Sequence, residues 1–396
     1  MNEQQVDILI VGGGLIGTAL HLALTGKGLN TLLIETFPLS DKVNSNFDAR
    51  TLALSPASMR ILQMLEIWPL LAAEASPIYT IYASEQGRFG KATLQRSNGQ
   101  PLGYVIEMQH INRAFSQLVD HKKILAPAEL IALDKQNNLA TIQHNTQKLT
   151  LKAKLIIAAD GAHSKVRQLA GLDKAVNVKD YAQHALVANI GLARPHGNCA
   201  YERFTQFGPL AMLPMTKQRM ALVWALSPIE ANRLHALADA EFLSQLQMVF
   251  GYKLGKFNQV GQKVIYPLKQ VIMPTPIAWP LVFIGNAAHT LHPVAGQGFN
   301  LGLRDVATLA QCIVQYGLSS EMLIQYQSMR NYDQYVISKF THGLVELFTS
   351  KLPGLGFLRS LGLSLFDNSG HLKKILTHHT RGFAGIIPDL VCGIDL

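Results

Sequence analysis

Three glycines close to the N-terminus have the spacing of a phosphate-binding turn. Gly12, Gly14 and Gly17 follow the short β-branched run at residues 6–11, and apolar residues then recur at helical spacing. Such glycines permit a tight turn between strand and helix, and they let a pyrophosphate approach backbone N–H groups at the positive end of the helix dipole. Glu35 ends the next apolar run, where a carboxylate accepts hydrogen bonds from ribose hydroxyls. We predict a β-α-β unit that binds a dinucleotide, the alternative being a glycine-rich turn without a ligand.

A second polar motif follows another predicted strand. Asp160 and Gly161 come directly after the buried run at residues 154–159 and just before a helix. This order places them at the carboxyl edge of the sheet, where ligands of open α/β sheets bind. The alternative is an ordinary strand-to-helix turn that Ser164 caps.

The segment at residues 285–302 is the richest in small residues. It follows a short apolar strand, and its Gly and Ala residues let the backbone lie against a planar ligand. We expect a helix from about Phe299, whose N-terminal dipole would favour a negative charge such as the one on the pyrimidine ring of a reduced flavin. His289 and His292 lie in the segment without a third ligand for zinc, and a structural role is the alternative to acid/base chemistry for both.

Arg50 follows a polar loop, and we predict that it reaches the phosphate or the ring of the cofactor. A surface arginine is the alternative. The three cysteines, Cys199, Cys312 and Cys392, are far apart and match neither a disulfide framework nor a zinc site.

The composition limits the class of protein. At 396 residues, two lobes in one connected body are expected. Hydrophobic residues make up 48% and charged residues only 15%, so we expect some apolar surface to meet an apolar partner. The net charge of +9 comes from scattered Lys and Arg, which argues against a nucleic-acid partner. Since no secretory leader and no apolar run of about 18 residues is recognisable, we expect a cytoplasmic protein.

Taken in order, the three motifs resemble those of the FAD-dependent aromatic hydroxylases, the family that includes para-hydroxybenzoate hydroxylase. Further segments are similar to the ubiquinone-biosynthesis branch: Asp-Ala-Arg-Thr at 48–51, Glu-Arg-Phe-Thr at 202–205 with Gly-Pro at 208–209, and His-Pro at 292–293 with Ala-Gly-Gln-Gly-Phe-Asn-Leu-Gly at 295–302. The wider family has Gly-Asp where this chain has Gly285 and Asn286. Asn286 resembles the members that act on 2-polyprenyl-6-methoxyphenol, and its amide can still hydrogen-bond a ribityl chain.

The resemblance implies FAD as the cofactor, with NADPH or NADH as electron donor, and oxygen transfer from a flavin C4a-hydroperoxide to a polyprenylated phenol without a metal. For catalysis it leaves only His292 and Pro293 as candidates. The predicted cofactor-binding residues are Gly12, Gly14, Gly17, Glu35, Arg50, Arg113, Asp160, Gly161, Asn286, Gly296, Gly298 and Asn300. Three alternatives stay open: a hydroxylase of the same pathway acting at another ring position, a flavin reductase or epoxidase acting on an isoprenoid, and a flavin-bearing structural subunit of the pathway complex.

The expected fold class is α/β: a discontinuous Rossmann-type FAD-binding domain with an inserted, mainly antiparallel β-sheet substrate lobe and C-terminal helices. Strand-like runs at 184–191, 209–215 and 219–226 indicate the inserted sheet. The expected division is 1–76, 110–178 and 276–342 for the FAD-binding domain, 77–109 and 179–275 for the substrate lobe, and 343–396 for the C-terminal helical region.

Two apolar segments near the C-terminus, 344–348 and 355–366, are separated by Pro353. One interpretation is a helix pair packed on the FAD-binding domain. The other is a contact face, because a polyprenyl substrate is insoluble and must be collected from a membrane or a lipid-carrying partner. On that interpretation we predict peripheral contact with anionic lipid or with other quinone-biosynthesis proteins. The basic residues suited to it are Lys351, Arg359, Lys373 and Lys374.

Overall fold

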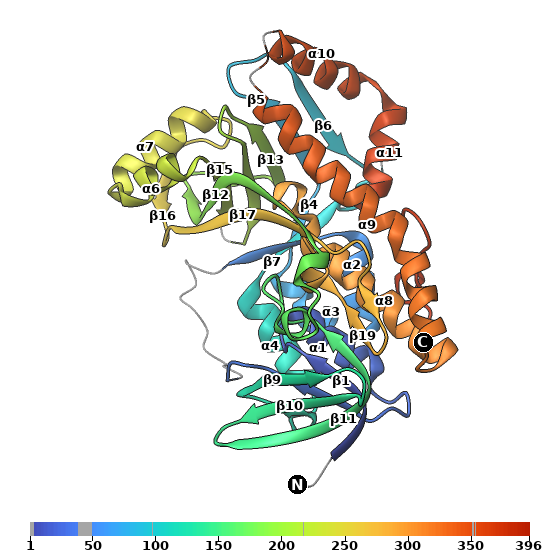
Figure 1. Ribbon diagram of the computed structural model, residues 1–396. Helices are drawn as coiled ribbons and strands as arrows, with labels where there is room; N and C mark the ends of the chain where they lie inside the picture. Colours follow the sequence, from blue (N-terminus) through green and yellow to red (C-terminus); the bar gives the residue numbers. More distant parts are fainter. Residues whose placement is uncertain (1–3, 39–49, 97, 217, 351, 353) are drawn as a thin grey trace.

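The protein is described by a computed structural model that covers residues 4–396 except 39–49, 97, 217, 351 and 353. One sheet with its helices forms the lower part of Figure 1, a second sheet forms the upper part, and long C-terminal helices run along both. The predicted α/β class, with an inserted sheet and C-terminal helices, is confirmed.

The lower sheet is the predicted Rossmann-type sheet. Its strands have the order β18-β19-β11-β1-β2-β8, and all but β18 run parallel to their neighbours. An antiparallel meander of β9 and β10 extends β11. The bounds are β1 (Gln4–Val11), β2 (Thr31–Ile34), β8 (Ile124–Leu125), β9 (Ala128–Asp134), β10 (Leu139–His144), β11 (Gln147–Ala158), β18 (Ile277–Ala278) and β19 (Leu281–Phe283).

Both faces of this sheet are covered, which is why its central strand is an apolar run. Ile8 and Ile10 pack in one core cluster with α1 (Leu15–Leu24), α4 (Met108–Leu118) and α8 (Gln297–Tyr316). Leu9 and Val11 pack in a second cluster with the meander and α5 (Lys165–Leu169). Helix α1 ends three residues before the expected Lys27, because Thr25 leaves the helical region and Gly26 has a φ of +77°.

The upper sheet is the inserted lobe. Its order is β20-β17-β12-β15-β14-β13-β5-β6 with β16 beside β12, and its pairs are antiparallel except β5 with β13. Helices α6 (Pro228–Ala236) and α7 (Asp239–Phe250) cover one of its faces. The bounds are β5 (Thr80–Glu85), β6 (Lys91–Gln95), β12 (Asn177–Leu192), β13 (Cys199–Phe204), β14 (Pro209–Met215), β15 (Arg219–Leu226), β16 (Phe257–Val260), β17 (Val264–Ile272) and β20 (His289–Thr290).

A three-stranded antiparallel sheet, β3-β7-β4, lies between the two larger sheets. It is made of β3 (Thr51–Leu54), β4 (Ser76–Ile78) and β7 (Gly103–Glu107). The segment 77–109, which we expected to belong to the substrate lobe as a whole, is thus divided: β5 and β6 join the upper sheet, but β7 pairs with β3. The short helices are α2 (Pro56–Met64), α3 (Trp68–Leu71), η1 (Ala72–Glu74), η2 (His121–Lys123), η3 (Asp173–Ala175), η4 (Gly285–Ala287) and η5 (Val294–Gly296).

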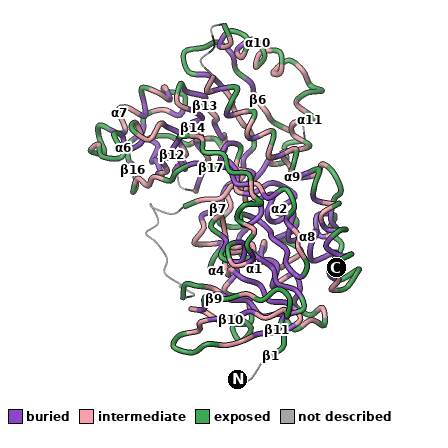
Figure 2. The backbone as a smooth tube through the Cα atoms, in the orientation of Figure 1, coloured by how far each residue is buried: buried purple, intermediate pink, exposed green. Residues whose placement is uncertain are grey.

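Four helices close the chain: α9 (Ser320–Thr349), α10 (Leu355–Asn368), α11 (Gly370–Thr380) and α12 (Asp389–Cys392). Helix α9 runs from the lower sheet to the upper one, and α10 lies beside β6 (Figure 1). The division expected between 342 and 343 therefore falls inside one 30-residue helix. The central strands β1, β2 and β19 of the lower sheet are mostly buried, whereas α10 and α11 keep many exposed positions (Figure 2). Within the described ranges, no helix has the length and apolar character needed to cross a membrane.

Candidate active site

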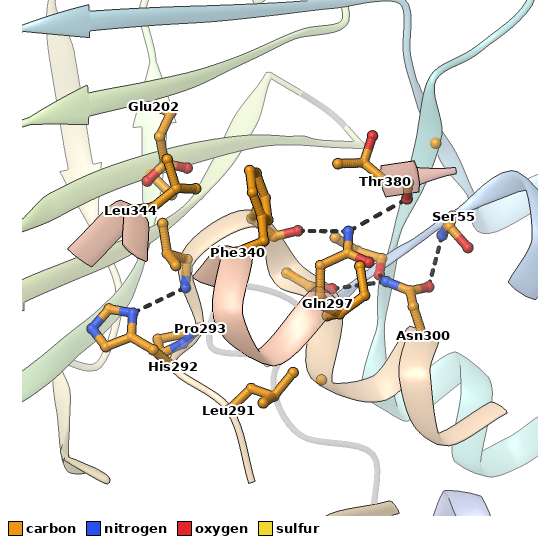
Figure 3. Close-up of a pocket in the computed structure, with 18 of the residues that line it drawn as sticks. Ser55, Glu202, Leu291, His292, Pro293, Gln297, Asn300, Phe340, Leu344 and Thr380 are labelled. Atoms are coloured by element: carbon orange, nitrogen blue, oxygen red, sulfur yellow. Dashed lines mark hydrogen bonds between the residues drawn. The ribbon is translucent and has the colours of Figure 1, made fainter. Parts of the chain in front are cut away.

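A cavity of about 1270 Å³ connects the lower sheet with the upper one. At one end its wall is the glycine turn, Gly161 and Asn286. At the other end the wall is formed by β5, β6, β13 and β14, together with apolar side chains of α9, α10 and α11. Residues 290–300, which form the loop before α8 and its first turn, also line the cavity, and Figure 3 shows part of this segment in close-up. The three predicted motifs thus share one cavity with the inserted lobe.

The three glycines of the first turn differ in what a Cβ atom would meet at each position. Gly12 has a φ of +107°, and a Cβ there would lie 2.6 Å from the carbonyl oxygen of Ala159. A Cβ on Gly17 would collide with the carbonyl oxygen of Gly12, so both glycines are needed by the protein itself. Gly14 differs, because it lines the cavity and a Cβ there would meet no atom within 4 Å. A ligand that lies against this backbone is a physical reason for glycine at that position, which fits a pyrophosphate at the start of α1.

Glu35 lies at the end of β2, beside the glycine turn. Its Oε2 accepts a hydrogen bond from the Gly13 N–H at 2.6 Å, and its Oε1 accepts one from the Phe37 N–H at 3.0 Å. The carboxylate is therefore held at the position where the adenosine ribose of a dinucleotide lies in this fold.

Asp160 and Gly161 follow β11 and lie close to the same turn. Asp160 Oδ2 accepts from the Val166 N–H at 3.0 Å, and Ser164 caps α5 by accepting from the Arg167 N–H at 3.1 Å. The capped turn that was the alternative interpretation is therefore present. However, Asp160 Oδ1 is buried without a hydrogen-bond partner among the described residues, and burial raises the pKa of this carboxyl. An unpartnered buried oxygen fits a site that a polar ligand completes.

The loop between β19 and α8 supplies the middle of the wall. Asn286 is exposed in the cavity, Gly296 has a φ of +58°, and a Cβ on Gly298 would meet no atom within 4 Å. Helix α8 begins at Gln297, two residues earlier than expected, so its free N–H groups lie at the cavity wall. This end of α8 favours a negative charge, as the sequence indicated.

Asn300 has a different role from the one predicted. Its Oδ1 accepts from the Ser55 N–H at 2.8 Å and from the Ser58 hydroxyl at 2.7 Å. Its Nδ2 donates to the carbonyl oxygens of Ala53 at 2.9 Å and Gly296 at 2.7 Å. These four bonds use the whole hydrogen-bonding capacity of the amide. Asn300 therefore fastens the start of α8 to β3 and α2, and it has no free polar atom for a cofactor.

A buried network of ion pairs on α8 and α9 holds the loop that follows β19. Asp305 on α8 accepts from the Gly285 N–H at 3.1 Å, from His289 Nε2 at 2.5 Å and from Arg330 Nε at 2.8 Å. Arg330 also donates to Asp333, at 2.7 Å. Burial alone would raise the pKa of Asp305, but the charges of His289 and Arg330 outweigh burial and hold it well below its usual range. His289 is thus a structural residue that fixes the loop.

His292 and Pro293 are brought to the cavity wall. Nδ1 of His292 accepts from the Val294 N–H at 3.2 Å, and its ring packs edge-on against Tyr181 with 5.1 Å between the ring centroids. Burial lowers the pKa of His292 to about 4, so the imidazole is neutral at physiological pH. Its Nε2 is buried without a partner. Since Nδ1 accepts, Nε2 carries the proton, and His292 can donate a hydrogen bond but cannot serve as an acid.

The two predicted arginines lie away from the described cavity wall. Arg50 is exposed directly before β3, and Arg113 is exposed on α4. The residues before Arg50 in the predicted motif, Asp48 and Ala49, lie outside the described residues. A role for Arg50 and Arg113 in binding the cofactor stays a prediction.

Among the polar residues of the wall that the sequence did not predict as site residues, Glu202 differs from the rest because it is a carboxyl on the inserted sheet. Glu202 on β13 lines the cavity, and its Oε1 is buried without a hydrogen-bond partner. Burial raises its pKa to about 7. The alternation along β13 was the available signal, because it places a carboxyl on the same face as Ala200 and Phe204.

Comparison with known proteins adds a second line of evidence. The FAD binding domain family model matches residues 5–332. Ubiquinone hydroxylase UbiL of Rhodospirillum rubrum is 32% identical over 413 residues, which cover 100% of this chain and 94% of that protein. 3-Demethoxyubiquinol 3-hydroxylase of Escherichia coli is 31% identical over 96% of this chain and 100% of that protein. The solved structure of p-nitrophenol 4-monooxygenase PnpA from Pseudomonas putida matches with a TM-score of 0.74 over 96% of this chain and 99% of its own, and at 16% identity it shows the fold alone.

Proposed function

Because this chain belongs to the FAD binding domain family, we propose that it is a hydroxylase of ubiquinone biosynthesis whose substrate is a polyprenylated phenol. It is a flavin-dependent aromatic monooxygenase, with FAD as cofactor and a nicotinamide dinucleotide and O₂ as co-substrates. The resemblance stated from the sequence is thereby confirmed for the family and for the type of reaction. The substrate and the ring position are our proposal.

The observation that carries the proposal is the contrast between the two ends of the cavity. The cofactor end has glycine backbone, the Gly161 turn and Asn286. The substrate end is apolar, with Ala92 and Leu94 of β6 in its wall, and it extends under α10 and α11. A phenol ring with a long hydrocarbon tail matches such a shape, because the tail buries apolar area while the ring stays near the cofactor.

Several of the predicted cofactor residues would then have a defined task. Gly14 and the start of α1 would hold the pyrophosphate, and Glu35 would accept from the ribose hydroxyls. Asn286 would hydrogen-bond the ribityl chain, and the start of α8 would stabilise negative charge on the flavin ring. When bound, FAD supplies the electron transfer and the oxygen activation that no side chain provides.

Asn286 supports 2-polyprenyl-6-methoxyphenol as the specific substrate. The support is the resemblance of the Gly285-Asn286 pair, whereas the relative from Escherichia coli is named a 3-hydroxylase. Hydroxylation at another ring position is therefore the second candidate. Chemical analysis of the product formed from 2-polyprenyl-6-methoxyphenol separates the two, since each predicts a hydroxyl group on a different carbon.

An apolar outer surface of α10 supports peripheral contact with a membrane or a lipid-carrying partner. Phe357 is 57% exposed and Leu365 is 62% exposed. Leu358 is 60% exposed and also lines the cavity, so this surface adjoins the substrate end. Two of the basic residues expected to face anionic lipid are paired within the fold instead: Arg359 with Glu85 and Lys373 with Asp367. A third, Lys351, lies outside the described residues, so the apolar surface is the main support for this contact.

The test of the proposed function is oxygen transfer. Purified protein with FAD is given NADPH or NADH, isotopically labelled O₂ and a prenylated 6-methoxyphenol, and the product is analysed by mass spectrometry. We expect one labelled oxygen atom in each product molecule. Oxidation of the nicotinamide with release of hydrogen peroxide alone, for every prenylated phenol tried, would contradict the proposal and favour a reductase. Absence of any turnover would favour the structural-subunit alternative.

A further inference from the structure

Glu202 is a carboxyl on an otherwise apolar wall. Along β13, residues 200, 202 and 204 share one face, and all three line the cavity. The cross-strand neighbours of Glu202 are Ala83 on β5 and Ala211 on β14, which also line it. The methyl groups of Ala83 and Ala211 flank the carboxyl across the sheet, so among the described residues its cross-strand neighbours leave open space above it and offer no polar group.

The carboxyl of Glu202 has no partner within the described part of the chain. Its Oε1 is buried, and neither oxygen takes part in a hydrogen bond or an ion pair with a described residue. A buried carboxylate oxygen without a partner costs free energy, so the arrangement at Oε1 is expected where a ligand supplies the missing hydrogen bond.

Charged groups on the surrounding elements are directed elsewhere. Arg203, the next residue on β13, donates to the carbonyl oxygen of Val249. Arg359 of α10 donates to Glu85 of β5 at 2.5 Å, so this cation is already neutralised. The α9 residues that line the cavity are apolar.

The remaining titratable groups of the wall also leave Glu202 unpaired. They are Tyr201 beside it on β13, His292 in the loop, and His379 and Arg381 at the end of α11. His292 is neutral, as its low pKa requires. Burial is the cause of the raised pKa of Glu202, about 7, and no neighbouring charge offsets it. Both protonation states of this carboxyl are therefore accessible near neutral pH.

We propose that Glu202 is the catalytic base that accepts the proton of the substrate's phenolic hydroxyl. The inference rests on the proposed function and names the residue that prepares the ring. In the step, the phenolic O–H bond breaks, its electron pair stays on the phenol oxygen, and the proton forms an O–H bond with a Glu202 oxygen. Carboxylate and phenol thereby become carboxylic acid and phenolate, with no change in total charge.

The position of Glu202 suits this task. It lies on the sheet side of the cavity, while His292 and Pro293 lie on the loop side (Figure 3). A phenol between them has the carboxyl on one side and the loop that leads to the start of α8 on the other. A phenolate is richer in electrons than a phenol and reacts more readily with an electrophilic oxygen, so the proton acceptor raises the rate of oxygen transfer. The apolar wall keeps water from replacing the phenol at this carboxyl.

The test compares wild-type holoenzyme with Glu202→Gln, which keeps the size of the side chain but cannot accept the proton, and with Glu202→Asp. The control is Glu129→Gln, which changes an exposed glutamate on β9. For wild type and control, we expect kcat/KM for hydroxylation to rise with pH through an apparent pKa near that of Glu202, about 7. In Glu202→Gln this rise should disappear and hydroxylation should fall by about 100-fold or more. Glu202→Asp should keep the pH dependence, and FAD content should be the same in all four proteins.

A second measurement does not depend on turnover. 4-Nitrophenol, whose phenolate absorbs visible light, is titrated on each protein. In wild type the bound phenol shares protons with Glu202, so its absorbance should change in two steps of pH, and in Glu202→Gln in one step. If wild type transfers no oxygen to any prenylated phenol, the proposed function fails, but this titration still tests Glu202. A single step or no spectral change in wild type, or an unaltered kcat/KM profile in Glu202→Gln, overturns the inference.

Discussion

Replacing Arg330 by Met should destabilise the fold and loosen the cofactor, because one guanidinium serves two buried carboxylates. Arg330 donates to Asp305 at 2.8 Å and to Asp333 at 2.7 Å, and the three side chains are 1%, 0% and 7% exposed. Each charge-assisted hydrogen bond contributes about 1.5–3 kcal/mol, and removing one partner of a buried pair costs about 3–5 kcal/mol. Asp305 keeps His289 and Asp333 keeps Arg304. We therefore expect the free energy of unfolding to fall by about 4 kcal/mol, a large share of the roughly 5–15 kcal/mol typical of proteins.

The loss should depend on pH in a defined direction. The folded-state pKa of Asp305 lies below its ordinary value of 3.8, since His289 and Arg330 outweigh the effect of burial. A carboxyl with a lowered pKa stabilises the fold at pH values above its unfolded pKa, and this contribution disappears as pH falls. The difference between wild type and Arg330→Met should therefore be largest near neutral pH and shrink below about pH 4, where the unfolded chain takes up protons.

The assay is thermal and chemical unfolding of the FAD-loaded protein at several pH values, with FAD retention followed by its absorbance. With an unfolding entropy of about 2.1 cal/mol/K per residue, 4 kcal/mol corresponds to a Tm about 5 °C lower for a chain of this size. The matched control is Arg233→Met, which breaks an exposed pair with Glu230 and should cost less than about 1 kcal/mol. Equal losses in the two variants at pH 7, or a loss in Arg330→Met that does not change with pH, would refute the reasoning.

Three further predictions concern the cofactor and the surface. Gly14→Val should weaken FAD binding by about tenfold or more, which corresponds to at least about 1.4 kcal/mol. The stability of the apoprotein should stay unchanged, because a Cβ at position 14 meets no atom of the protein within 4 Å. Gly343→Ala in α9 is the control. Unchanged FAD affinity would exclude a close approach at Gly14. Arg50→Ala should lower the flavin midpoint potential by about 10–30 mV if this cation reaches the ring, and an unchanged value removes it from that role. Phe357→Asp with Leu365→Asp should reduce flotation with anionic liposomes, and equal flotation would leave the α10 surface without a membrane role.

The sequence predicted those parts of the site that local chain geometry determines. The conformation of the glycine turn depends on contacts between nearby backbone atoms, so its residue types predict the turn before the fold is known. Strands β14 and β15 have the bounds expected from their apolar runs, because a short run closed by turn residues has few other conformations. Their place in the sheet required the structure, since β13 pairs with β5, more than a hundred positions earlier in the chain.

The sequence failed where a residue's role depends on distant partners. Asn300 was predicted as a cofactor ligand, yet its amide is used by residues more than two hundred positions away, on β3 and α2. The division expected between 342 and 343 falls inside α9, which continues from Ser320 to Thr349. The local sequence pattern could not predict the hydrogen bonds of the Asn300 amide or the length of α9, because both depend on segments that only the fold brings together.

Two carboxyls, Asp305 and Glu202, have opposite tasks although burial raises the pKa of each. Asp305 is fully buried, whereas Glu202 is partly exposed at the cavity wall with one buried oxygen, Oε1. Asp305 is surrounded by donors and stays ionised, so it can hold the Gly285 loop in one position. Glu202 lies between alanines without a donor, so its proton is free to move. Gln297 and His292 likewise present buried polar atoms without partners at the wall of the same cavity. Buried polar atoms without partners also occur behind the loop, at His289 and Arg304, but those at the cavity wall are in reach of a ligand that could complete them.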